Sequence, residues 1–262
     1  MSVTVPPSAP ELYESLPLSQ DDLRVLQVQP GNGEIIQCKL ERLRLWREHA
    51  TREYICLSYT WGDGLYSHDI LVNGLKFQVK PNLYEFLLAV RKKNLTDWIF
   101  IDAICIDQCN LLERNQQVQQ MGKVYHQALY VLIWLGHIFT MTAGLGISMT
   151  IGSRNALKRL HLNPEWFGHS MAFDGCKRIH AHPYWRRMWI VQEMAVARRR
   201  KVFIGEVIVE WDRFYDGYVQ PLDVGTGLRC AELDNLYVTR NRLSLMSFGD
   251  ALRESLLYSD AW

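Results

Sequence analysis

Aromatic, hydroxyl and glycine residues gather where a short apolar run at residues 54–59 ends. The group consists of Ser58, Tyr59, Trp61 and Gly62. A continuous apolar run is typical of a buried parallel strand, and open α/β sheets bind ligands at the carboxyl ends of their strands. We therefore expect these residues to line a ligand site, where the rings could stack on a planar group and the Gly62 backbone could approach a phosphate. The alternative, that Trp61 is simply a large core residue, is equally compatible with the sequence.

Two carboxylates stand in or just after a second apolar run, at residues 98–106. Asp102 and Asp107 could each accept a hydrogen bond from a ribose hydroxyl or cap the helix that we expect to begin near Asn110. For Asp107 we favour the cap.

Other reactive groups carry weaker signals. Cys105, Cys109 and His126 have neither zinc-finger spacing nor a second CxxC pair, so we predict no metal site. Cys105 lies in an apolar run, which is typical of a small core residue rather than of an activated thiolate. The basic run at residues 198–201 is most simply the positive end of a helix, although it could contact a partner or a phosphate.

Composition favours one large folded domain. The 262 residues are 48% hydrophobic and 22% charged, which is enough to bury a sizeable core. The formal charge of +1 provides no overall field that would attract nucleic acid or an anionic membrane. No apolar run approaches the roughly 20 residues of a membrane span, and the first residues do not resemble a secretory signal. We therefore predict a cytoplasmic protein whose six cysteines are reduced thiols.

Positioning these residues requires a defined order of strands and helices. Turn signals predict two β-hairpins, and apolar runs alternate with amphipathic segments after the first hairpin. In chain order we expect a hairpin at 23–45 around Pro30-Gly31, a strand at 54–59, a hairpin at 70–79 around Asn73-Gly74, a helix at 82–91, a strand at 98–106, a helix at 110–130 and a strand at 130–135. This alternation predicts an α/β fold with parallel strands and crossover helices.

The remaining segments divide the chain further. Four prolines predict an extended leader over residues 1–20, and scattered glycines suggest a helical insertion at 137–180. We expect a helix at 184–197 and two strands joined by a glycine turn at 201–211. We expect residues 231–262 to form an amphipathic helical extension without a stop signal, which suggests that they lead into a longer protein.

Three blocks dense in uncommon residues occur in order, at 57–62, 98–108 and 184–193. Together they resemble the three signature blocks of the fungal heterokaryon incompatibility (HET) domain, and the segments between them agree from about residue 20 to residue 211. The resemblance implies a HET domain over residues 21–230. It also implies a role in programmed cell death during fungal non-self recognition, a form of innate immunity, triggered through self-association by a regulatory partner or an appended domain.

The HET family is similar to the TIR domain, a flavodoxin-like fold in which some members cleave NAD and others only assemble. This similarity implies a TIR-like central parallel sheet flanked by helices, with added hairpins and a helical insertion. The local match is Trp189 followed four residues later by Glu193, similar to the Trp-x-x-x-Glu on the TIR helix that carries the catalytic glutamate.

Glu193 is therefore the candidate catalytic residue for NAD cleavage. One carboxylate beside the ribose could stabilise the oxocarbenium-like centre, because nicotinamide leaves as a neutral group. The resemblance makes NAD a substrate, implies no resident cofactor, and places Glu193 in a cleft. The implied substrate-binding residues are Ser58, Tyr59, Trp61, Gly62, Asp102, Arg186 and Trp189. In the alternative interpretation, Glu193 is a solvated helix residue paired with Arg186 or Arg187.

Two functions remain open on the sequence. The first is an NAD glycohydrolase that clustering activates, which the spacing of Trp189 and Glu193 favours. The second is a non-catalytic signalling module that acts by self-assembly or by recruiting a partner, and the lack of a visible second catalytic group leaves it open.

Overall fold

The computed structural model describes residues 9–46, 50–137, 179, 181–187 and 190–215, and these belong to two compact units. The first unit comprises residues 1–132 and 196–199, and the second comprises residues 133–195 and 200–262. The chain passes from one unit to the other within strand β7 (Val131–Trp134). We describe each unit by itself.

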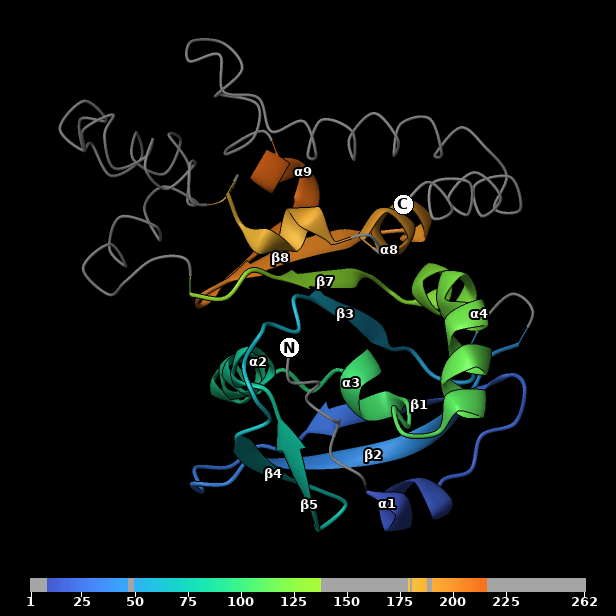
Figure 1. Cartoon of the computed structure of the whole chain (residues 1–262). Helices are drawn as coiled ribbons and strands as arrows, with labels where there is room; N and C mark the ends of the chain where they lie inside the picture. The colour runs from blue at the N-terminus through green and yellow to red at the C-terminus, as the bar shows by residue number, and fades with distance from the viewer. Residues whose placement is uncertain (1–8, 47–49, 138–178, 180, 188–189, 216–262) are drawn as a thin grey trace, which may run out of the picture. The chain divides into compact units, whose positions relative to one another are not determined.

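A mixed β-sheet forms the centre of the first unit (Figure 1). Its strand order is β5-β4-β2-β1-β6-β3-β7. The strands other than β7 are β1 (Asp22–Val28), β2 (Gln37–Arg44), β3 (Ile55–Tyr59), β4 (His68–Val72), β5 (Leu75–Val79) and β6 (Ile99–Phe100). β1 is antiparallel to both of its neighbours, whereas β3 and β6 are parallel.

The three strands expected at 54–59, 98–106 and 130–135 are neighbours, as predicted. The Leu129 N–H donates to the Tyr54 carbonyl, and the Cys56 N–H donates to the Tyr130 carbonyl. Residue numbers therefore increase in the same direction along both segments, which is the arrangement of parallel strands. Every residue of β3 and of β7 is buried, which explains their continuous apolar sequences.

Both predicted hairpins are confirmed, and the second is fixed by its turn. Asn73 and Gly74 join β4 to β5 with φ of 51° and 81°, the left-handed conformation that favours these residue types. The Asn73 side chain also accepts from the Leu40 N–H and donates to the Leu40 carbonyl, both at 2.9 Å. The hairpin turn is thereby tied to β2.

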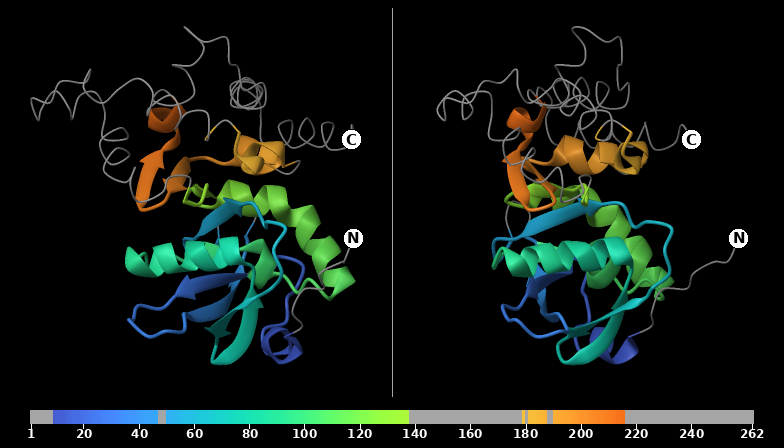
Figure 2. Two further views of the ribbon diagram at one scale, coloured as in Figure 1. Left: turned by 60° about the vertical axis from the view of Figure 1, so that its left-hand side comes forward. Right: turned by 90° about the vertical axis from the view of Figure 1, so that its left-hand side faces the viewer.

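Helices pack against this sheet, and α2 (Pro81–Lys92) and α4 (Leu111–Gln127) lie on opposite sides of it (Figure 2). Both helices were predicted. α2 begins with Pro81, whose fixed φ suits the first turn of a helix, and it buries Leu83, Phe86 and Leu87. α3 (Asp102–Cys105) follows β6 directly. α1 (Pro10–Glu14) precedes β1 and buries Leu12 and Tyr13.

The second unit holds a small aromatic core. Its described elements are η3 (Pro183–Arg186), α8 (Ile190–Val196), β8 (Arg200–Ile204), β9 (Val207–Glu210) and α9 (Trp211–Phe214). The Trp185 ring packs against the rings of Trp211 and Phe214 at centroid distances of 6.2 and 6.3 Å. β8 and β9 form the predicted hairpin, with Gly205 at φ +56°.

Three predictions of local structure were wrong. The run 98–106 forms two strand residues and then helix α3, in which the Cys105 N–H donates to the Ile101 carbonyl at 2.7 Å. A short buried run has no periodicity that separates a strand from a helix.

The other two concern helices. Residues 184–197 are not one helix, since Arg187 is extended at ψ 130° between η3 and α8. Residues 10–14 of the expected extended leader are helix α1, with Leu12 and Tyr13 buried.

The α/β class is confirmed, but antiparallel β1 beside β6 makes the sheet of the first unit mixed rather than parallel. The TIR-like arrangement and the 21–230 domain boundaries remain predictions. The insertion at 137–180 and the extension at 231–262 lie almost entirely outside the described residues. Among the described helices, none has the length and apolar character needed to cross a membrane.

Candidate functional site

Trp61 and Asp102 meet at the carboxyl ends of the adjacent parallel strands β3 and β6. The Trp61 indole Nε1 donates to both carboxylate oxygens of Asp102, at 3.0 and 3.2 Å. Asp102 also accepts from the Ala103 N–H at 2.8 Å, which helps α3 begin there. The sequence placed both residues in the site, and the structure brings them together.

The loop after β3 is anchored by residues at the start of α2. The Lys80 ammonium donates to the Gly62 carbonyl at 2.9 Å, and the Asn82 side chain donates to the Thr60 carbonyl. Gly62 has φ +72°, a conformation that residues with a Cβ rarely adopt. Lys80 and Asn82 were not predicted as site residues; the only signal for them was the position of Pro81 at a helix start.

A small pocket opens beside this loop. Aromatic and apolar side chains dominate its lining, which consists of Tyr59, Trp61, Tyr66, Phe77, Gln78, Val79, Lys80, Leu83 and Ala103. It has room for about one water molecule, whereas sites for small organic ligands usually enclose roughly 300 to 1000 Å³. A planar ring could therefore enter only if the loop or the Trp61 indole moved.

The site residues predicted for the first unit differ in their exposure to solvent. Ser58 and Tyr59 are buried, Trp61 is half-buried and Gly62 is exposed.

The helix cap was predicted at the wrong residue. Asn110, rather than Asp107, accepts from the Glu113 N–H at 3.2 Å and caps α4. Asp107 instead accepts from the Cys109 N–H at 3.0 Å, because it lies too early in the turn to reach the first N–H groups of the helix.

In the second unit, Glu193 forms a two-pronged ion pair with Arg187. The Arg187 Nη2 and Nη1 atoms donate to the two carboxylate oxygens of Glu193 at 3.1 and 3.3 Å. Arg187 also lies over the Tyr184 ring at 5.6 Å. Glu193 is only 4% exposed. The alternative interpretation of Glu193 was thus right about an arginine partner, and the partner is Arg187, but wrong about a solvated carboxylate.

The predicted site residues therefore fall into two groups. Arg186 is exposed and belongs with Glu193 to the second unit, while Ser58, Tyr59, Trp61, Gly62 and Asp102 belong to the first. Trp189 lies outside the described residues. The cleft expected to join Glu193 to the loop after β3 remains a prediction.

The described cysteines form no disulfide, and most of them are buried. Cys38, Cys56 and Cys105 are buried, and Cys109 is exposed. Burial raises the pKa of Cys105 to about 12, so this thiol stays protonated at neutral pH and is a poor nucleophile. Cys176 and Cys230 lie outside the described residues. Within the described part of the chain, no three His, Cys, Asp or Glu side chains gather as a metal site would require.

Comparisons with known proteins agree on one family. The family model described as Heterokaryon incompatibility protein (HET) matches residues 54–193, more than half of the chain. Heterokaryon incompatibility protein 6 (OR allele) of Neurospora crassa is 33% identical over 96 residues, which cover 32% of this chain and 14% of that protein. The chain thus matches only a small part of that relative's length. No solved structure matches the chain.

Proposed function

Because the chain belongs to the heterokaryon incompatibility family, we propose that it is a cell-death effector domain of fungal non-self recognition. The observation that carries this proposal is the family match over residues 54–193, which contains all three signature blocks. In this proposal the domain acts in the cytoplasm, and a regulatory partner or an appended domain triggers it by clustering.

The chemical activity that we propose is NAD cleavage with Glu193 as the catalytic carboxylate. NAD is the substrate, and no resident cofactor is required. Two observations support this assignment. Glu193 is buried on helix α8, where a charge acts more strongly than in water. At the carboxyl ends of β3 and β6, Trp61 and Asp102 supply a flat ring and a carboxylate for binding.

The test is NAD consumption by purified protein that is clustered artificially. We expect Glu193→Gln to lower the rate by roughly a hundredfold or more, because the substitution removes the charge opposite the oxocarbenium-like centre. Glu210→Gln is the matched control, since Glu210 is an exposed carboxylate of the same unit. It should leave the rate unchanged.

The fold of the Glu193 variant must be measured alongside its rate. Glu193 is buried and paired, so the Gln substitution weakens two charge-assisted hydrogen bonds and costs about 1 to 3 kcal/mol. Circular dichroism at the assay temperature separates a folded but inactive variant from an unfolded one. A folded Glu193→Gln variant that cleaves NAD as fast as the parent would rule out Glu193 as the catalytic residue.

The second candidate function is the non-catalytic module that acts by self-assembly or recruitment. It is favoured by the engagement of both Glu193 oxygens with Arg187 and by the small size of the pocket beside Trp61. If neither the parent nor the Glu210→Gln control consumes NAD when clustered, this candidate replaces the enzyme.

A further inference from the structure

The segment at residues 9–16, which we call the N-terminal strap, is held by tertiary contacts. It contains α1, whose five residues are too few to form a stable helix alone. Leu12 and Tyr13 are nevertheless buried, and the strap lies upstream of the family match at residues 54–193. Its order must therefore come from the residues against which it packs.

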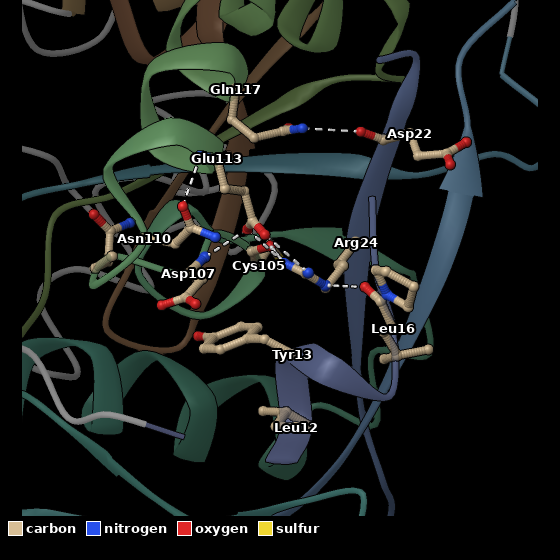
Figure 3. A network of polar contacts seen from close by, with 12 residues as sticks. Leu12, Tyr13, Leu16, Asp22, Arg24, Cys105, Asp107, Asn110, Glu113 and Gln117 are labelled. Atoms are coloured by element: carbon tan, nitrogen blue, oxygen red, sulfur yellow. Dashed lines mark hydrogen bonds and ion pairs between the residues drawn. The ribbon is translucent and has the colours of Figure 1, made fainter. Parts of the chain in front are cut away.

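Two residues fasten the strap (Figure 3). The Tyr13 hydroxyl donates to the Ile104 carbonyl of α3 at 3.0 Å. Arg24, on strand β1, donates through Nε to the Leu16 carbonyl at 2.8 Å, and its guanidinium lies 4.8 Å from the centre of the Tyr13 ring. The strap thus covers one face of a buried cation and bonds directly to α3.

Arg24 extends these contacts to the start of α4. Its Nη1 donates to the Cys105 carbonyl at 3.2 Å and to Glu113 at 2.6 Å, and its Nη2 donates to the other Glu113 oxygen at 3.1 Å. Glu113 also accepts from the Asp107 N–H at 2.7 Å. Arg24 and Glu113 therefore fix the backbone of residues 105–113 at both ends.

The same segment carries the candidate site. α3 begins at Asp102, which binds the Trp61 indole, and the Gln108 side chain donates back to the Asp102 carbonyl at 2.9 Å. A continuous series of contacts thus runs from Tyr13 through α3 to Asp102 and Trp61. All of these residues lie in the first unit.

We propose that the N-terminal strap is a conformational control element for the Trp61–Asp102 pair. When the strap is seated, α3 is ordered and Asp102 holds the indole. When the strap is displaced, Arg24 loses the Leu16 carbonyl and its contact with the Tyr13 ring. Ile104 loses its bond to Tyr13 as well, so α3 loosens and releases Trp61. This control goes beyond the proposed function and does not depend on NAD cleavage.

Hydrogen exchange of the full chain tests this proposal with two matched variants. Tyr13→Phe and Tyr54→Phe each remove one buried hydroxyl that donates to a backbone carbonyl, but the Tyr54 partner is Val124 of α4 rather than α3. We expect Tyr13→Phe to speed amide exchange at residues 103–107 about three- to tenfold, the equivalent of one hydrogen bond. Tyr54→Phe should change it less than twofold.

The indole N–H signal of Trp61 provides the second measurement. Its NMR resonance is assigned by its loss in Trp61→Phe, and its exchange with water should also quicken in Tyr13→Phe. Equal effects of both tyrosine variants on residues 103–107, or no effect of Tyr13→Phe there, would overturn the proposal. Faster exchange of α3 with an unchanged Trp61 signal would overturn it too, since the strap would then not reach the site.

Discussion

Each of the two units contains a two-pronged arginine–glutamate pair, and the two pairs differ in which member is the more buried. Arg24 and Glu113 are 89 positions apart and their side chains are 1% and 13% exposed, so the arginine is the more buried member. Arg187 and Glu193 are six positions apart and are 19% and 5% exposed, so the glutamate is the more buried member. A buried charge that loses its partner is costly, so each pair depends most on its more buried member. The first pair, which we call the anchor, therefore stabilises a buried cation, and the second stabilises a buried carboxylate.

Removing the anchor should have the largest effect on stability. Glu113→Gln leaves Arg24 buried without a countercharge, so we expect the free energy of unfolding to fall by about 3 kcal/mol. Urea denaturation followed by circular dichroism measures this loss.

Glu41→Gln is the control for that variant. Glu41 pairs with Lys39 and Arg52 near the surface of the first unit, where ion pairs contribute at most about 1 kcal/mol. If the Glu41 and Glu113 variants lose equal stability, burial of Arg24 does not set the strength of the anchor.

Breaking the second pair should cost less than breaking the anchor. Arg187→Met removes the cation that is paired with the buried Glu193, which we expect to cost about 2 kcal/mol at pH 7. Urea denaturation at pH 7 measures the loss.

The double variant Arg187→Met, Glu193→Gln removes both charges together. It should be more stable at pH 7 than Arg187→Met alone, because the buried charge of Glu193 is removed along with its cation. A double variant that is no more stable than Arg187→Met would contradict the assignment of the loss to the buried charge of Glu193.

Asp22 is a buried carboxylate of the first unit, and its loss should have the smallest effect because its partner Arg44 is exposed. Burial opposes ionisation of Asp22, but hydrogen bonds from the Arg44 side chain and the Ser19 N–H outweigh it and hold its pKa below the usual value. Its contribution to stability is therefore complete above about pH 4 and disappears as the pH falls through the lowered pKa. Asp22→Asn should cost about 1 kcal/mol at pH 7 and nothing in strong acid.

Urea denaturation of the parent and of Asp22→Asn over a series of acidic pH values measures this difference in the free energy of unfolding. A cost of Asp22→Asn that persists below the lowered pKa would mean that the charge of Asp22 is not what stabilises the first unit.

Local chemistry made much of the fold predictable. Asn73-Gly74 suits only a few turn types, and the apolar run from Ile55 to Tyr59 is buried over its whole length. The helix at Asp102–Cys105 could not be predicted, because long-range bonds from Tyr13 and Arg24 stabilise it. Arg24 itself carried no signal, since a charged residue in a strand ordinarily faces solvent.

The candidate site was predictable to a similar extent. The rule that places ligands at strand ends put Trp61 and Asp102 in one region, and they share two hydrogen bonds. The pairing of Glu193 with Arg187 depends on the extended conformation of Arg187 between η3 and α8, which the helical pattern of the sequence conceals.

The place of β1 in the sheet limits how the chain can be shortened for expression. β1 lies between β2 and β6, although it precedes the range 54–193 that the family model matches. A fragment confined to that range would expose the hydrogen-bonding edge of β6 and would leave Glu113 without Arg24. Bare strand edges pair with other chains, so such a fragment should aggregate in recombinant cells. A recombinant form that keeps the β6 edge paired and Arg24 in place therefore needs to begin before Asp22.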